Sequence, residues 1–234
     1  MASRSSQTGA VISAKGLEKR FAGRGRRPVV VLEGADLEIW PGARVLLRGD
    51  SGSGKTTLAR CVAGLETPDA GEIYCAAEGG RTTPADAGWP RRVQLVRQAA
   101  GESLNPRWTV LELLCEPGEI QEIGDGASRR RESMEWLKRI GLPEGAAGSR
   151  AGELSGGQRA RLAVARALTL QPALLILDES LTSLDLSEQA RMLNLLVEAQ
   201  ERAPVSYLFI SHRPGMIRAV ATAEMAMEAG RIRR

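Results

Sequence analysis

A glycine-rich loop at residues 49–56, G-D-S-G-S-G-K-T, has the residue types and spacing that cradle a polyphosphate. Its glycines let successive backbone N–H groups point inward, and a following helix adds its positive N-terminal dipole. Lys55 can bring a mobile charge to the β- and γ-phosphates, while the Thr56 hydroxyl can ligate Mg²⁺. Flanking strand-like and helix-like runs favour this interpretation over a plain Gly/Ser turn. The residues predicted to contact ATP here are Gly49, Asp50, Ser51, Gly52, Ser53, Gly54, Lys55, Thr56 and Thr57.

A pair of carboxylates follows the apolar run 174–177, which predicts a strand buried on both faces of a parallel sheet. An open α/β sheet places its ligand at the carboxyl ends of such strands. Asp178 is therefore expected to hold Mg²⁺, and Glu179 to polarise an attacking water as general base. An acidic pair that merely caps the next turn is the alternative, which the phosphate loop upstream disfavours.

Residues 154–158, L-S-G-G-Q, open a predicted helix that continues to residue 168 before Pro172. Ser155 and Gln158 have the spacing of a capping box. Gly156 and Gly157 would leave the N–H groups of the first turn open to a phosphate. An ordinary capped helix explains the serine and the glutamine, but not two glycines where helix propensity disfavours them.

In this order and spacing the three stretches resemble the nucleotide-binding subunit of an ABC transporter, over nearly the whole chain from Val11 to Arg231. The resemblance implies an α/β fold: a P-loop NTPase core of the ABC ATPase type with an antiparallel β-subdomain and a helical subdomain. It also implies ATP and Mg²⁺ as ligands. The signature loop would close on the γ-phosphate of ATP held by a second subunit, in a homodimer or a heterodimer. Its residues are Leu154, Ser155, Gly156, Gly157 and Gln158.

The resemblance implies roles for four further residues. Gln98, after the strand-like run 93–97, would touch Mg²⁺ and the attacking water, although glutamine at a strand end is common. His212, the only histidine of the chain, would contact the γ-phosphate. Asp185 would serve communication between subunits, and it could equally cap the following helix. Phe21 would stack on adenine, with a core aromatic or a loop side chain as alternatives.

A finer resemblance is to importers of dipeptides, oligopeptides and nickel, through residues 93–110, residues 183–190 followed by 193–196, and residues 206–212. The sequence departs from that group at Ala99-Ala100 and at Arg213-Pro214, which weakens the expectation of a peptide substrate. The resemblance implies an ATPase that energises a membrane importer, with permease subunits as partners and, indirectly, a solute-binding protein. Such a subunit would be cytoplasmic and peripheral on the inner face of the cell membrane. An ATPase of a soluble complex resembling phosphonate C–P lyase, or a low-turnover regulatory module, remains an alternative.

Composition excludes several other classes of function. The net charge is only +4 and aromatic residues make up 3% of the 234-residue chain, which argues against nucleic-acid binding. Cys61, Cys75 and Cys115 lack the spacing of metal ligands and are expected to be buried thiols in a reducing compartment. The sequence opens without the pattern of a signal peptide and lacks an apolar run of the ~18 residues that a membrane span needs. Membrane attachment would therefore depend on partners.

Several elements must position these residues. Parallel strands are expected near residues 44–48, 93–97, 173–178 and 205–210, alternating with helices. Helices are also expected at 109–115 and 128–140, separated by loops at 116–125 and 143–152. The predicted organisation is a disordered N-terminus at 1–9 and one ABC ATPase domain at 10–234. Within that domain we expect a β-subdomain at 10–48, a nucleotide-binding core at 49–98 and 160–234, and a helical signature subdomain at 99–159.

Overall fold

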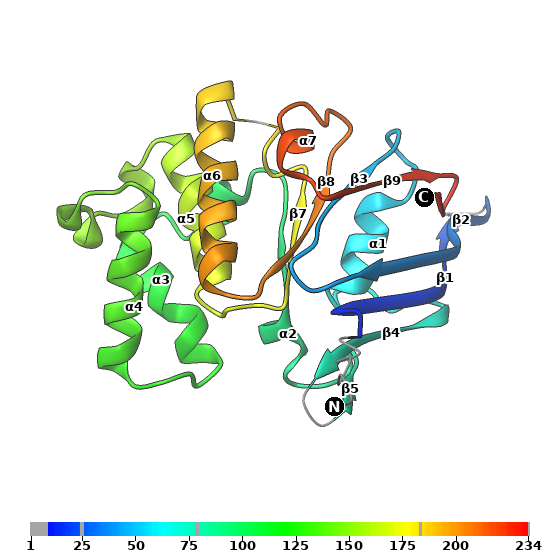
Figure 1. Ribbon diagram of the computed structural model, residues 1–234, viewed down its shortest axis with the longest axis horizontal. Helices are drawn as coiled ribbons and strands as arrows, with labels where there is room; N and C mark the ends of the chain where they lie inside the picture. Colours follow the sequence, from blue (N-terminus) through cyan, green and yellow to red (C-terminus); the bar gives the residue numbers. More distant parts are fainter. Residues whose placement is uncertain (1–8, 24–25, 78–79, 183, 234) are drawn as a thin grey trace, which may run out of the picture.

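A computed structural model of the protein describes residues 9–23, 26–77, 80–182 and 184–233. The expected disordered segment 1–9 therefore lies outside the described residues, apart from Gly9. At the centre is a six-stranded sheet with the order β10-β9-β3-β8-β7-β6 (Figure 1). β3 pairs in parallel with β8 and β9, and β7 pairs in parallel with β6 and β8. The strands are β3 (Arg44–Arg48), β6 (Val93–Val96), β7 (Leu174–Asp178), β8 (Ser206–Ile210), β9 (Ala223–Glu228) and the antiparallel β10 (Arg231–Arg233).

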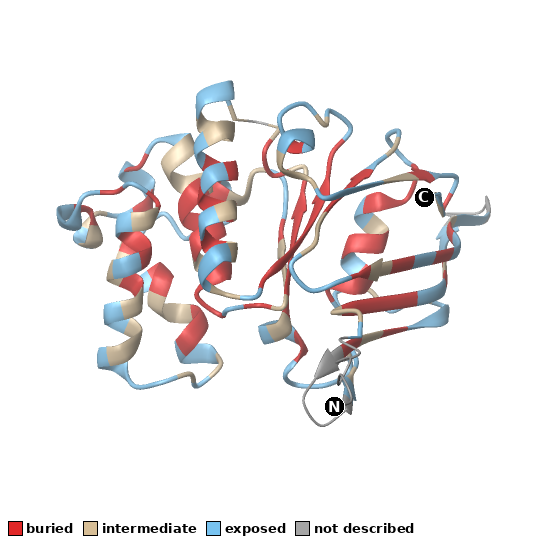
Figure 2. Cartoon of the chain, in the orientation of Figure 1, coloured by how far each residue is buried: buried red, intermediate tan, exposed pale blue. Residues whose placement is uncertain are grey.

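The two central strands β7 and β8 are buried at every position, because both faces of the sheet are covered. Figure 2 shows buried residues concentrated on these strands and on the helices on either side of them. The parallel strands expected from the apolar runs are all present. Their carboxyl ends point to one edge of the sheet, where the loops that follow them meet.

A second, antiparallel sheet has the order β2-β1-β4-β5. Its strands are β1 (Ile12–Gly23), β2 (Arg26–Ile39), β4 (Ala70–Ala77) and β5 (Gly80–Thr82). The expected confinement of this sheet to residues 10–48 is wrong, because β4 and β5 come from the segment 49–98. The reason is the long-range pairing of β1 with β4, for example Ile12 with Cys75, which local sequence patterns do not reveal.

Helix α1 (Lys55–Val62) lies between the two sheets, with Leu58 and Val62 in a core that both sheets share (Figure 1). The short helix α2 (Trp89–Arg92) closes the bottom of this core. Its Trp89 is buried, and the Trp89 Nε1 donates to the carbonyl oxygen of Val62 at 3.1 Å. Because α1 begins inside the glycine-rich loop, its burial fixes that loop against the sheet.

The other end of the molecule is mostly helical (Figure 1). It contains α3 (Val110–Ile120), α4 (Gly126–Arg139) and α5 (Gly156–Leu168), which pack with α6 (Leu186–Arg202) and the short α7 (Ile217–Val220) in one core. The 3₁₀ turn η1 (Ala100–Glu102) lies between β6 and α3, and η2 (Glu144–Gly148) and η3 (Ala151–Glu153) lie between α4 and α5. α5 crosses the expected boundary between residues 159 and 160. None of the described helices is long and apolar enough to span a lipid bilayer.

Two helix boundaries differ from the sequence-based expectation. α3 continues through Pro117 to Ile120, although residues 116–125 were expected to form a loop. Pro117 is buried, and the neighbouring Glu116 accepts a hydrogen bond from Arg166 Nε of α5 at 2.9 Å, so tertiary contacts hold this part of the helix although proline removes one backbone hydrogen bond. α4 begins before Ser128, because Asp125 is the N-cap and accepts from the Ser128 N–H at 2.7 Å.

The three cysteines are free thiols. Cys61 and Cys75 are buried, as expected, and burial raises the pKa of the Cys61 thiol to about 11. Cys115 is only partly buried, and its Sγ lies 3.3 Å from the Ser133 Oγ.

Candidate active site

The glycine-rich loop follows β3 and leads directly into α1, as the sequence predicts. At two positions of the loop only glycine fits, because a backbone carbonyl oxygen lies too close for a Cβ atom and because of the backbone conformation. A Cβ on Gly49 would lie 2.3 Å from the carbonyl oxygen of Met227, and one on Gly54 would lie 2.6 Å from that of Val31. Gly54 also has a φ of 107°, a left-handed value that L side chains rarely adopt. The loop is therefore held between β2 and β9 in a shape that only glycine allows at these positions.

Lys55 is almost fully buried, with 5% of its surface exposed. Its Nζ donates to the carbonyl oxygens of Gly49 at 2.8 Å and Asp50 at 2.7 Å, across the mouth of the loop. The ammonium group is thus already placed inside the cradle that would hold a polyphosphate. Asp50, Ser51, Gly52 and Thr56 are exposed at the rim, whereas Thr57 is partly buried in the first turn of α1.

Asp178 ends β7 and is 5% exposed. Burial raises the pKa of its carboxyl, and the hydrogen bond from the Thr56 hydroxyl and the charge of Lys55 oppose that rise. The Asp178 Oδ1 is buried without a hydrogen-bond partner. A buried carboxylate oxygen without a partner, next to a hydroxyl, is a donor set that fits Mg²⁺, which also takes oxygens from phosphates and waters. In the described part of the chain, no group of three or more His, Cys, Asp and Glu side chains forms a separate metal site.

Glu179 and His212 lie together at the same sheet edge. The His212 Nδ1 is 3.0 Å from the Glu179 Oε1, and both side chains are partly exposed. They meet because β7 and β8 are neighbours, with Asp178 paired to Ile210. Glu179 has a φ of 51°, and its N–H donates to the carbonyl oxygen of Ile210 at 3.0 Å. A left-handed glutamate is uncommon, and such strained residues concentrate at functional sites.

The capping box at the start of α5 is present as predicted. The Ser155 Oγ accepts from the Gln158 N–H at 3.2 Å, and the Gln158 side chain accepts from the Ser155 N–H at 2.8 Å. Leu154 is buried in the helical core. The two glycines differ in their surroundings: a Cβ on Gly156 would meet nothing within 4 Å, whereas one on Gly157 would lie 2.6 Å from the Glu188 Oε2 of α6. Gly157 therefore has a packing reason that the sequence did not reveal, while Gly156 faces open space.

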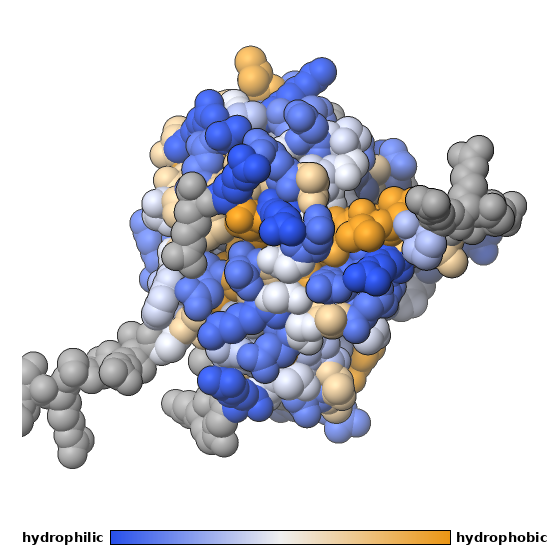
Figure 3. Space-filling model, turned by 90° about the vertical axis from the view of Figure 1, so that its right-hand side faces the viewer, coloured by the Kyte–Doolittle hydropathy of each residue, from blue (hydrophilic) through white to orange (hydrophobic). Residues whose placement is uncertain are grey.

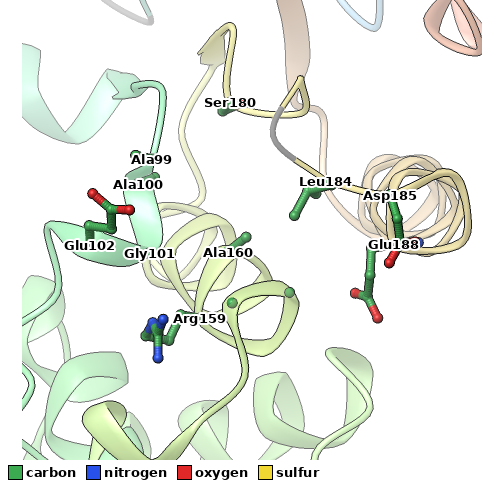
Figure 4. Close-up of a pocket in the computed structure, with 12 residues that line it drawn as sticks. Ala99, Ala100, Gly101, Glu102, Arg159, Ala160, Ser180, Leu184, Asp185 and Glu188 are labelled. Carbon is green, nitrogen blue, oxygen red and sulfur yellow. The ribbon is translucent and has the colours of Figure 1, made fainter.

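Gln98 is exposed just after β6, at the same sheet edge. The turn that follows it, η1, packs closely on α5, and a Cβ on Gly101 would lie 2.8 Å from the Arg159 Cβ. The segment after Gln98 and the first turns of α5 and α6 enclose a pocket of about 260 Å³. Figure 4 shows Glu102 and Arg159 on one side of this pocket and Asp185 and Glu188 on the other.

Asp185 caps α6, which agrees with the simpler of its two interpretations. Its Oδ1 accepts from the Glu188 N–H at 2.9 Å and from the Ser187 Oγ at 2.8 Å. These hydrogen bonds, the first of them most of all, lower the pKa of the Asp185 carboxyl. Because Asp185 also lines the pocket beside Gly156, capping does not prevent a second role. Ser183 lies outside the described residues.

Phe21 lies in β1, opposite Val29 of β2, and its ring is 39% exposed. It is therefore neither a core aromatic nor a loop side chain. The Lys19 Nζ lies 5.4 Å from the centroid of the ring. Sequence reasoning missed Lys19 and Glu188; the signals that could have pointed to them are a lysine two residues before the aromatic in a strand, and a glutamate in the first turn after Asp185.

Most of the predicted residues thus meet at one edge. The phosphate loop, Gln98, the Asp178–Glu179 pair and His212 follow neighbouring strands of the parallel sheet. Gly156, Gly157 and Asp185 instead line the pocket beside η1, whose lining includes no residue of the phosphate loop. One copy of the chain therefore carries two separate groups of site residues.

Comparisons with known proteins give the following relatives. Residues 32–182 match the model of a family described as ABC transporter. The chain is 37% identical over 224 residues to a protein of Brucella ovis named for peptide import and ATP binding, covering 95% of this chain and 70% of that protein. It is 34% identical over 206 residues to the oligopeptide transport ATP-binding protein OppF of Lactococcus lactis subsp. lactis, covering 87% of this chain and 65% of that protein.

Among solved structures, the chain is similar to the dimeric ATP-binding cassette MJ0796 in a post-hydrolysis state bound to ADP and Pi. The TM-score is 0.81 and the sequence identity 27%, over 95% of this chain and 97% of that one. This likeness confirms the expected α/β fold class.

Proposed function

This chain belongs to the ABC transporter family, and we propose that it is the ATP-hydrolysing subunit of a membrane importer whose solute is a peptide. The observation that supports hydrolysis best is the convergence of Lys55, Asp178, Glu179 and His212 at one sheet edge. The peptide assignment is supported by the names of the relatives. Nickel and the soluble-complex alternative have no such support.

The residues at the sheet edge divide the reaction among them. Backbone N–H groups of the phosphate loop and Lys55 would bind the phosphates of ATP, and Thr56, Asp178 and Gln98 would hold Mg²⁺. The metal would neutralise charge on the phosphate oxygens. Phe21 would stack on the adenine.

Glu179 would accept a proton from the water that attacks the γ-phosphate, as its carboxylate is at the end of the strand beside Asp178. His212, whose Nδ1 lies 3.0 Å from the Glu179 Oε1, would hold that carboxylate in position and contact the γ-phosphate. Hydrolysis would leave ADP and phosphate, with the proton of the water on Glu179.

A second copy of the chain, or a close relative, would complete each site. Ser155, Gly156 and Gly157 are exposed or partly exposed at the start of α5, and the pocket that Gly156 and Gly157 line includes no residue of the phosphate loop of their own chain. Gly156 in particular leaves open space that a phosphate could enter. The γ-phosphate would thus be held between the phosphate loop of one copy and residues 154–158 of the other, with Asp185 at the boundary between them. The dimeric state of the similar cassette supports this arrangement.

The permease would contact the face near residues 98–108. Trp108 is 37% exposed there, and it borders a groove of about 420 Å³ between α3 and α4 that Leu111 and Cys115 also line. Glu112, Glu119 and Arg130 also line this groove, so a short amphipathic helix of a membrane subunit would suit it. Through such permease subunits the chain would lie on the inner face of the cell membrane and work with a solute-binding protein.

Peptide uptake tests this function directly. A strain that lacks the gene should lose uptake of labelled oligopeptides, and the wild-type gene should restore it. Glu179→Gln should fail to restore uptake, whereas Glu201→Gln, an exposed position near the end of α6, should restore it fully. Normal peptide uptake in the strain without the gene would overturn the proposed substrate. Full restoration by Glu179→Gln would overturn the role of ATP hydrolysis.

A further inference from the structure

Lys19 is a buried lysine beside the exposed ring of Phe21, and nothing in the proposed hydrolysis uses it. We propose that Lys19 is a positioning residue for the base of ATP: it holds the Phe21 ring and ties that ring to the segment that follows α1. This inference rests on the proposed function, because it takes Phe21 as the surface on which the adenine stacks.

The ammonium group of Lys19 is fixed by oxygen atoms of one short segment. Its Nζ lies 2.9 Å from the Glu66 Oε1, 2.7 Å from the Thr67 carbonyl oxygen and 3.4 Å from the Asp69 Oδ1. Lys19 is only 9% exposed, and a buried charge is tolerated when it is paired and hydrogen-bonded in this way. The hydrogen bond with Glu66, opposed by burial, raises the pKa of Lys19, so the group stays charged.

The backbone around Lys19 is fastened to the same segment. The Arg20 N–H donates to the Asp69 Oδ2 at 2.6 Å, and the Asp69 N–H donates to the Glu18 carbonyl oxygen at 2.8 Å. The segment 66–69 comes shortly after the end of α1 at Val62. A continuous set of contacts therefore runs from the phosphate loop through α1 to the residues immediately before Phe21.

Strand β2 places the same region next to the phosphate loop. Lys19 pairs with Leu32 and Arg20 with Val30, so Val31 is the extra residue of a bulge opposite them. The carbonyl oxygen of Val31 lies where a Cβ on Gly54 would approach within 2.6 Å. The base surface and the phosphate loop are thus joined on two sides, through β2 and through α1.

The ring of Phe21 contacts the Lys19 ammonium on one side, and the rest of the ring is partly exposed to solvent. At 5.4 Å from the ring centroid, the Lys19 Nζ is within the range of a cation–π interaction. Val29, which is exposed and lies opposite Phe21 on β2, extends the apolar surface on the same face of the sheet. Figure 3 shows apolar patches interrupting the hydrophilic surface on the side of the molecule where the antiparallel sheet lies. A nucleotide base could stack on this surface while its phosphates occupy the loop.

Binding of ATP compared with inorganic tripolyphosphate tests the inference, because only ATP has a base. By calorimetry, Lys19→Met should weaken ATP binding about 2- to 5-fold, as expected for one cation–π contact, and leave tripolyphosphate binding unchanged. The KM for ATP should rise by the same factor while kcat stays constant. Lys15→Met is the matched control, because it removes an exposed positive charge from the same strand. It should change the affinity for neither ATP nor tripolyphosphate.

A double-mutant cycle separates this inference from the proposed role of Phe21. Phe21→Ala should weaken ATP binding but not tripolyphosphate binding, and Lys19→Met should have no further effect in that background. If Phe21→Ala binds ATP as tightly as the wild type does, the adenine does not stack on Phe21. The positioning role of Lys19, which depends on that stacking, would then be refuted as well.

Two further outcomes would overturn the inference while leaving Phe21 in its role. The first is Lys19→Met binding ATP as the wild type does. The second is an equal loss of tripolyphosphate affinity, which would mean that Lys19 supports only the fold of the loop. If Lys19→Met does not fold, Glu66→Gln is the substitute, because it weakens the main anchor of the ammonium and should change ATP binding in the same direction.

Discussion

The two glycines at the start of α5 should respond oppositely to alanine, because their surroundings differ. In Gly157→Ala the new Cβ would lie 2.6 Å from the Glu188 Oε2. That carboxylate is paired with Arg161, which is buried, and with Arg191, which is exposed. Displacing Glu188 would cost about 1.5–3 kcal/mol for the buried pair and ~0.5 kcal/mol for the exposed one. Alanine regains at most about 1 kcal/mol of helix propensity, so we expect a net loss of roughly 1–2.5 kcal/mol.

Gly156→Ala should instead keep or slightly raise stability, since the new Cβ would meet nothing within 4 Å. Its methyl group would, however, enter the space that we assign to the γ-phosphate bound by a second copy. We expect ATPase activity to fall at least ~10-fold, which corresponds to about 1.4 kcal/mol of lost transition-state stabilisation.

Equilibrium urea unfolding measures the first effect, and phosphate release at saturating ATP measures the second. The two variants should differ by about 2 kcal/mol in the free energy of unfolding, with Gly156→Ala the more stable. Wild-type ATPase activity in Gly156→Ala would refute the contact with phosphate. Wild-type stability in Gly157→Ala would refute the packing argument.

Three other substitutions test individual roles. Glu179→Gln should retain ATP binding and slow turnover by about 10²–10⁴-fold, the usual contribution of a general base; unchanged steady-state phosphate release would remove Glu179 from that role. Lys55→Ala should weaken ATP binding by about 1.5–3 kcal/mol in calorimetry, because it deletes charge-assisted contacts, and equal affinity would contradict it. Burial raises the pKa of Asp178 in the folded state, so its ionisation costs stability as the pH rises above the ordinary pKa of an aspartate. Asp178→Asn should therefore make the nucleotide-free protein more stable at pH 7, with a gain that disappears in acid, and should abolish Mg²⁺-dependent hydrolysis. A lower stability at pH 7 would show that the ionised carboxylate is favourable.

The sequence predicts the elements that local patterns define. The phosphate loop has its glycine spacing, β7 and β8 are continuous apolar runs, and α5 begins with a capping box; each of these patterns specifies one element without help from distant residues. The sheet edge follows from them, because parallel strands bring their carboxyl ends together.

Features that depend on contacts between distant segments escape local patterns. β4 joins the antiparallel sheet only through its pairing with β1. α3 continues beyond Pro117, where the neighbouring Glu116 accepts a hydrogen bond from Arg166 of α5. Gly157 is glycine because Glu188 packs against it, and Lys19 is fixed by the segment 66–69. Both partners lie far away in the sequence.

Crosslinking between two copies tests most directly whether the phosphate loop of one faces α5 of the other. Ser51 and Ser155 are both exposed, and both would be replaced by cysteine in the Glu179→Gln background, with each single replacement as a control. Mild oxidation should give a disulfide-linked dimer when ATP and Mg²⁺ are present, and little or none with ADP or in either single variant. No crosslinked dimer with ATP, or the same yield without nucleotide, would contradict the shared site.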